Sequence, residues 1–98
     1  MTFCAYILYS PALDKFYVGS THDMESRLSK HLANYYGKSF SSRATDWEIY
    51  LRIACDNEAH ARRVENHIKK MKSGTYYQSL KSVSGLSQKL ADRFRVTN

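Results

Sequence analysis

Residues that break or loosen a fold are scarce in this sequence, which has one proline and four glycines among 98 residues. Disordered chains are usually rich in such residues and poor in apolar ones. Here 43% of the residues are hydrophobic and 13% are aromatic, which is enough for a modest core. A chain this short is too small for two domains, so we expect residues 1–98 to form a single domain.

Cysteine and long apolar runs are scarce as well. Cys4 and Cys55 are the only cysteines, and neither belongs to a CxxC or CxxH pair, so a zinc site would need scattered histidines to complete it. No stretch approaches the roughly 20 apolar residues of a membrane span, and the N-terminus lacks the basic segment and apolar run of a secretory signal. We expect free thiols that pack as small hydrophobic groups, no membrane segment and a cytoplasmic location.

Negative charge is the minority sign. Fifteen Lys and Arg residues against nine Asp and Glu give a formal net charge of +6 and a pI near 9.4, and nine of the fifteen follow position 60. A basic surface speeds association with polyanions, of which nucleic acid comes first and acidic membrane surfaces second. The plainer alternative is that the charge only keeps the protein soluble.

Two short apolar runs near the start of the chain have the composition of strands. Residues 3–9 and 16–18 are rich in aromatic and β-branched side chains, and turn-forming residues lie between them. The second strand should end at Gly19. Alternation gives the first strand two apolar faces, with Ala5, Ile7 and Tyr9 on one and Cys4, Tyr6 and Leu8 on the other. Such a strand suits the middle of a small sheet packed between helices.

The pattern then changes to a helical period. Met24, Leu28 and Leu32 recur every four residues and predict a helix over about 23–33. Ser20 with Asp23, or Thr21 or Asp23 alone, can cap it. Arg27 and His31 lie four residues apart on the flank of its apolar stripe. Residues 34–46 are predicted to form a long loop.

In the second half of the chain, a predicted strand is again followed by a predicted helix. In residues 47–55, Trp47, Ile49, Leu51, Ile53 and Cys55 alternate, which predicts a third strand with these side chains on one side. Asn57 begins an amphipathic helix that Ser73 and Gly74 end. Further helical turns follow at 76–80 and over Leu86, Leu90 and Phe94.

Together these elements predict an α/β (α+β) domain with a small antiparallel sheet flanked by helices. The expected order is β-β-α-β-α plus C-terminal helical turns, with a core over about 3–72 and a helical extension over about 75–95.

Glu65 stands out as the one carboxylate expected in a helix whose other polar residues are mostly basic. An ion pair with Lys69, one turn later, explains it without any function. A carboxylate among Lys and Arg is also what Mg²⁺ needs when it bridges a protein and a phosphate. Arg27 and His31 are equally ambiguous, and strand tyrosines are normally core residues. Composition and spacing alone therefore reach only a small basic α/β domain, with nucleic acid as a candidate partner.

A family resemblance reaches further. The order Cys4-Ala5-Tyr6, then Tyr17-Val18-Gly19, then Arg27, His31 and Glu65 resembles the GIY-YIG nuclease domain, and most of all its small stand-alone bacterial members. The similarity runs from about residue 3 to 71, through FYVGST, ESRLSKH and ARRVENHIKKMKSG. In the first motif Cys4 and Ala5 replace the family's glycine and isoleucine, so only its tyrosine is kept.

The resemblance implies a three-stranded antiparallel sheet and a nuclease site lined by Tyr6, Tyr17, Arg27, His31 and Glu65. Glu65 would ligate Mg²⁺ or Mn²⁺, and Arg27 would hold a nonbridging phosphate oxygen. Tyr17 would orient or deprotonate the attacking water, with Tyr6 and His31 as alternative proton carriers. A phenol is protonated at neutral pH, so it would need help from the metal or from nearby cations.

Several other residues are expected to contact DNA outside the chemistry. Gly19 would let the substrate backbone come close to the sheet. Cationic candidates are Lys38, Arg43, Lys69, Lys70 and Lys72.

The main hypothesis is thus a metal-dependent endonuclease that acts on duplex or branched DNA. The alternatives are a non-cleaving nucleic-acid-binding module and an accessory protein that docks a partner nuclease or repair factor. The apolar residues Leu86, Leu90 and Phe94 are the expected docking surface for such a partner.

Overall fold

A computed structural model describes residues 3–32 and 46–95 of the protein, without the side chains of residues 31 and 32. It confirms the predicted α+β class. The elements, in chain order, are β1 (Phe3–Ser10), β2 (Lys15–Thr21), α1 (Met24–Leu32), β3 (Glu48–Cys55), α2 (Glu58–Met71), α3 (Gly74–Ser82) and α4 (Leu86–Arg93). None of the helices in the described ranges could cross a membrane, given their lengths and apolar content.

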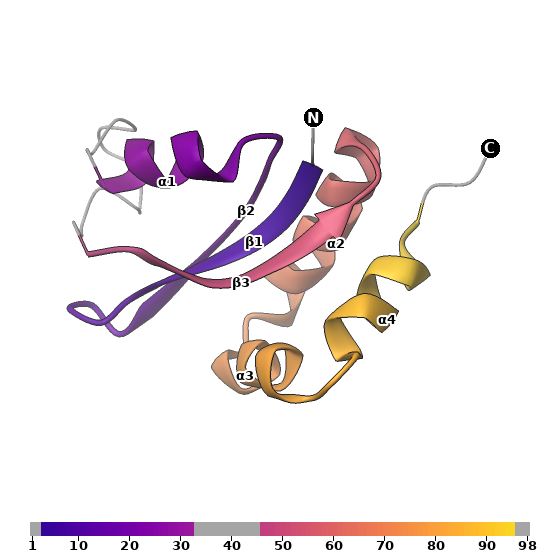
Figure 1. The fold of residues 1–98 in the computed structure, drawn as a ribbon. Helices are drawn as coiled ribbons and strands as arrows, with labels where there is room; N and C mark the ends of the chain where they lie inside the picture. The colour runs from indigo at the N-terminus through magenta and orange to yellow at the C-terminus, as the bar shows by residue number, and fades with distance from the viewer. Residues whose placement is uncertain (1–2, 33–45, 96–98) are drawn as a thin grey trace.

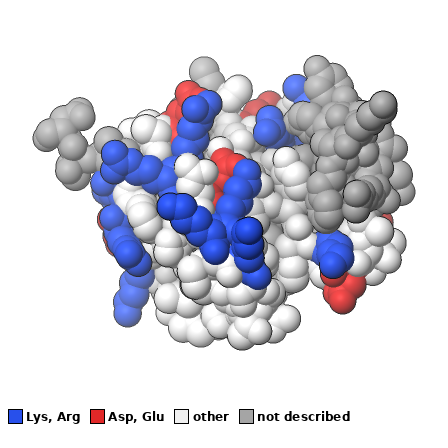
Figure 2. Space-filling model, turned by 180° about the vertical axis from the view of Figure 1, so that it is seen from behind, with Lys and Arg blue, Asp and Glu red and all other residues white. Residues whose placement is uncertain are grey.

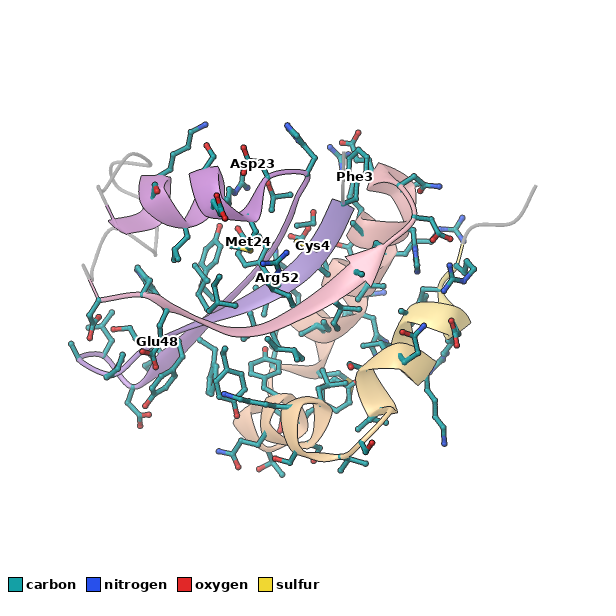
Figure 3. All side chains as sticks on the ribbon, viewed as in Figure 1. Phe3, Cys4, Asp23, Met24, Glu48 and Arg52 are labelled. Atoms are coloured by element: carbon teal, nitrogen blue, oxygen red, sulfur yellow. The ribbon has the colours of Figure 1, made fainter. Side chains whose placement is uncertain are left out.

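The three strands form one antiparallel sheet in the order β2-β1-β3, with helices on both faces (Figure 1). The prediction that the first strand is central is confirmed. One face carries what we call the α1-side core: Cys4, Tyr6, Leu8, Met24 and Trp47. The other carries the α2-side core: Ala5, Ile7, Val18, Ile53, Val64, Ile68, Tyr77, Leu80, Leu90 and Ala91. Figure 3 shows Cys4 and Met24 close together between the sheet and α1.

The predicted faces of the third strand are wrong. Ile7 pairs with Leu51 but Leu8 pairs with Ile49, so one extra residue, Tyr50, lies in β3 at this point. Such a bulge reverses the alternation on one side of it. Leu51 therefore packs with the α2-side core, whereas Trp47 lies in the α1-side core and Ile49 is 38% exposed.

Strand β2 is longer than predicted and does not end at Gly19. It continues to Thr21, because Gly19, Ser20 and Thr21 pair with Tyr6, Ala5 and Cys4 of β1. Asp23 then caps α1, since its carboxylate accepts the backbone N–H of Ser26 at 3.1 Å. Ser20, one of the predicted capping residues, instead donates its hydroxyl hydrogen bond to Glu65 of α2.

Helix α2 also ends differently from the prediction. Its C-cap is Lys72, which adopts the left-handed conformation with φ of 47°. Ser73 instead caps the next helix by accepting the backbone N–H of Tyr76 at 3.2 Å, and Gly74 is the first residue of α3. The Ser-Gly pair therefore begins a helix here rather than ending one.

Helix α4 covers the sheet on the same side as α2. Leu90 is buried in the α2-side core, and Leu86 and Phe94 pack against it. The domain itself thus covers Leu90 and part of Leu86 and Phe94, and a partner docked on this helix stays a prediction.

Candidate nuclease site

A cleft of about 790 Å³ lies where β2 ends, between the start of α1 and the first three turns of α2. It is bordered by polar groups from segments far apart in the sequence. Its lining residues are Phe3, Ser20, Thr21, His22, Arg27, Glu58, Ala61, Arg62, Glu65 and Asn66.

Arg27 reaches this cleft from the first turns of α1. Its Nε donates a hydrogen bond to the hydroxyl oxygen of Tyr6 at 3.1 Å. The Tyr6 side chain is 0% exposed in the α1-side core, so its hydroxyl is a fixed acceptor behind the guanidinium. Tyr6 therefore orients Arg27 and lies away from the solvent of the cleft.

Gly19 makes the space that Tyr6 occupies. The two residues are directly paired across β1 and β2, and a Cβ on Gly19 would lie 2.6 Å from Cζ of the Tyr6 ring. Carbon atoms without a bond between them do not approach so closely. Glycine is thus required here by a neighbouring side chain, and a contact between Gly19 and DNA stays a prediction.

Tyr17 packs beside Tyr6 on the same face of the sheet. The ring centroids are 6.5 Å apart with planes 29° apart, and Trp47 lies edge-on to Tyr17 at 6.3 Å. Tyr17 is partly exposed but is not among the residues that line the cleft. The two phenols thus lie on the α1 face of the sheet.

Glu65 approaches the cleft from the other face, on α2. Its side chain is 15% exposed and both of its oxygens are held. Oε1 accepts a hydrogen bond from the Ser20 hydroxyl at 2.6 Å, and Oε2 lies 2.6 Å from Nζ of Lys69. The predicted ion pair with Lys69 is present. The Ser20 contact was missed because the strand was expected to end one residue earlier; in a longer strand, Ser20 points toward α2.

Glu65 is not the only carboxylate of α2, contrary to expectation. Glu58 begins the helix, lines the same cleft and pairs with Arg62 at 2.7 Å. Both side chains of that pair are more than 60% exposed, so water screens it strongly. Glu65, more enclosed and bonded across elements, is the better defined acid of the cleft.

Of the five residues implied by the family resemblance, the structure brings two to the cleft wall. Arg27 and Glu65 line it from different helices, and Tyr6 lies directly behind Arg27. Tyr17 lies beside Tyr6, and the side chain of His31 is outside the part that the structure describes. His22 lines the cleft and was not singled out from the sequence, where no spacing marked it.

Cations gather on the α2 side of the molecule (Figure 2). Figure 2 shows Lys and Arg side chains gathered over the face behind the sheet, around a small acidic area. Lys69, Lys70 and Lys72 are all exposed, as nucleic-acid contacts must be, whereas Lys38 and Arg43 lie outside the described residues. Whether any of these residues touches DNA stays a prediction.

The donor set fits a cation shared with a substrate better than one caged by the protein. No group of three or more His, Cys, Asp or Glu side chains within residues 3–30 and 46–95 could hold a metal ion. Mg²⁺ often binds through one carboxylate, with water and substrate phosphates as its other ligands. Glu65 can supply this one carboxylate, because the partner of its Oε2 is Lys69, a solvent-exposed side chain that a cation can replace.

The two cysteines belong to the cores. Cys4 lies in the α1-side core and Cys55 packs against the α2-side core. Burial raises the pKa of both thiols, so they are poor thiolate donors at neutral pH.

Comparison with known proteins assigns the chain to a family. A family model described as the GIY-YIG catalytic domain matches residues 2–78. The solution NMR structure of a UPF0213 protein from Bacillus halodurans is similar, with a TM-score of 0.50 and 24% sequence identity over 99% of this chain and 100% of that one. That likeness concerns the fold alone, and no curated protein matches the chain. The family match spans most of the sequence, including Arg27 and Glu65. The chain therefore belongs to the GIY-YIG nuclease family.

Proposed function

We propose that this protein is a metal-dependent endonuclease that hydrolyses DNA phosphodiester bonds in the cleft at the end of β2. The observation that carries the proposal is that Arg27 and Glu65, from two different helices, line one cleft. A guanidinium and a carboxylate in the same cleft can serve opposite needs of one phosphate: the first binds its oxygens, the second binds its counter-cation.

Arg27 would hold a nonbridging oxygen of the scissile phosphate and oppose the charge that develops there as water attacks. The Tyr6 hydroxyl fixes the guanidinium from behind, so little reorganisation is needed on substrate binding. Water adds to phosphorus while the bond from phosphorus to the 3′ oxygen breaks, which leaves a 5′-phosphate and a 3′-hydroxyl.

Glu65 would hold Mg²⁺ or Mn²⁺ through Oε2 while Ser20 retains Oε1. When bound, such a cation neutralises phosphate charge and helps the 3′ oxygen leave. Tyr17 remains the expected residue to orient or deprotonate the water, with His31 as an alternative. His22 is a further candidate for proton transfer, because its imidazole lines the cleft.

A cleavage assay tests the proposal. Supercoiled plasmid and branched DNA are incubated with the protein in Mg²⁺, in Mn²⁺ and in chelator, beside the Arg27→Ala, Glu65→Gln and Glu25→Gln variants. Glu25 is an exposed acid on α1 and controls for the change of charge. We expect metal-dependent nicking that falls about 10²- to 10³-fold in the first two variants and stays near wild type in the third.

A non-cleaving nucleic-acid-binding module is the second candidate. It is favoured by the ion pair that neutralises Glu65 and by the position of Tyr17 outside the cleft wall. Salt-dependent DNA binding without nicking in any metal would establish it and would overturn the endonuclease. Each phosphate contact should then contribute about −0.9 to the slope of log affinity against log salt.

A further inference from the structure

The two oxygens of Glu65 have partners of very different kinds. Oε1 is bound by a hydroxyl from β2, 45 residues earlier in the chain, and Oε2 is bound by an ammonium one turn further along α2. Both contacts measure 2.6 Å, so the carboxylate is held at each end. What differs is how easily each partner can leave.

Ser20 is a rigid partner. Its backbone is paired with Ala5 of the central strand, and its short, partly buried side chain has one rotatable bond to the oxygen. Lys69 is a mobile partner, since its side chain is 52% exposed and its flexible four-carbon stem can take the ammonium into water. Oε1 is therefore fixed to the sheet, whereas Oε2 has a replaceable cation.

A divalent cation and an ammonium at the same carboxylate oxygen repel each other, so the two cations compete for Oε2. Binding of a metal at Oε2 therefore favours departure of Lys69 into water. The displaced ammonium stays tethered to α2, one turn beyond Glu65 and on the helix that carries Arg62 into the cleft. From there it can pair with a phosphate oxygen instead of the carboxylate.

We propose that Lys69 is an internal counter-cation of Glu65 that a divalent metal displaces, and that Ser20 is the positioning residue that confines this exchange to Oε2. The proposal rests on the proposed function, since it requires Glu65 to accept a divalent cation. It goes beyond that function by assigning roles to two residues and by predicting that metal loading frees a lysine for the substrate.

Mn²⁺ binding to the whole protein without DNA tests the role of Lys69, with free Mn²⁺ measured by electron paramagnetic resonance. Lys69→Met is compared with Lys70→Met, which removes the same charge from the next position of the helix. Lys70, like Lys69, is exposed. We expect Lys69→Met to bind Mn²⁺ about fivefold more tightly than Lys70→Met, the effect of releasing a competing ion pair. Equal affinities of the two variants would overturn the proposal.

The role of Ser20 is tested in the same assay. Ser20→Ala should weaken Mn²⁺ binding about tenfold, as loss of a partner that orients a metal ligand does, and Ser20→Thr should restore it because threonine keeps the hydroxyl. Equal unfolding midpoints of the two variants exclude a general loss of structure. The positioning role would be overturned if Ser20→Ala and Ser20→Thr both bound Mn²⁺ weakly, or if both bound it as tightly as wild type.

Glu65→Gln separates failure of this inference from failure of the proposed function. If Mn²⁺ binds and Glu65→Gln abolishes the binding, but the two lysine variants are equal, only the counter-cation proposal is wrong. If no variant shows Mn²⁺ binding that depends on Glu65, either without DNA or with a short duplex that supplies phosphate ligands, the metal site and the counter-cation fail together.

Discussion

Two polar side chains of α2, His60 and Glu65, differ in their burial and in the kind of partner that holds them. His60 is 0% exposed; its Nδ1 accepts the backbone N–H of Asp56 at 3.0 Å, so its Nε2 donates to the carbonyl oxygen of Ala91 at 2.7 Å. Glu65 keeps some exposure, lines a cleft and is held by side chains. Backbone partners cannot move without unfolding, whereas an exposed lysine can.

The comparison separates two side chains of one helix. His60 fixes the fold, because it connects the end of β3 to α4. Glu65 lines the cleft. Substitutions of His60 should therefore change stability and leave cleavage intact, and substitutions of Glu65 should do the reverse.

The largest effect on stability is expected for His60→Ala. It leaves the N–H of Asp56 and the carbonyl of Ala91 without partners and opens a cavity in the core, so we expect a loss of about 3 kcal/mol in the free energy of unfolding. Urea denaturation measures it. At temperatures where the variant stays folded, its cleavage rate should match wild type; a loss of less than about 1 kcal/mol would contradict the structural role.

Gly19→Ala tests a position in β2 where stability and the cleft are coupled through Tyr6. The added Cβ would overlap the Tyr6 ring, so we expect a loss of about 2 kcal/mol together with slower cleavage, because Tyr6 orients Arg27. Gly74→Ala is the matched control, since its Cβ would meet Phe16 at an ordinary 3.6 Å. Thermal unfolding and plasmid nicking measure the two effects, and equal stabilities of the two variants would refute the steric account.

A smaller effect of opposite sign is expected for Lys72→Gly. Lys72 has a left-handed conformation that glycine adopts without steric cost, so we expect a gain of about 0.5–1 kcal/mol. Lys72→Ala, which lacks the charge but keeps the Cβ, separates backbone strain from electrostatics. If alanine stabilises as much as glycine, the left-handed cap is not the cause.

The smallest effect is a pH dependence at the hairpin between β1 and β2. Hydrogen bonds from the Ser10 hydroxyl and the Ala12 N–H lower the pKa of Asp46 below its ordinary 3.8. Because the folded state holds this carboxylate charged, its contribution is complete above the unfolded-state pKa and is lost as pH falls through the folded one. The stability difference between wild type and Asp46→Asn should therefore shrink from pH 6 to pH 3, and a difference that is constant with pH would contradict this.

Local patterns in the sequence were sufficient for much of the fold. The two apolar faces of β1 follow from alternation, the start of α2 from Asn57, and the stripe of α1 from four-residue spacing. Periodicity could not show the extra residue in β3, because a bulge changes the register without changing the composition.

The candidate site depended on contacts between distant residues. The family resemblance identified Arg27 and Glu65, and the structure confirms only that they line one cleft. The Ser20 contact joins residues 45 apart, and His60 gave no sign in the sequence of its full burial. Both depend on how α2 lies against the sheet, which no local pattern encodes.

The separation of structure from function is tested most directly by one variant, Glu65→Gln, measured in two ways. Glutamine keeps the shape of the side chain and can still accept from Ser20, but it cannot hold a divalent cation as a carboxylate does. We predict unfolding within about 1 kcal/mol of wild type and a loss of metal-dependent plasmid cleavage of about 10²-fold or more. Cleavage at the wild-type rate by a folded Glu65→Gln protein would contradict the account.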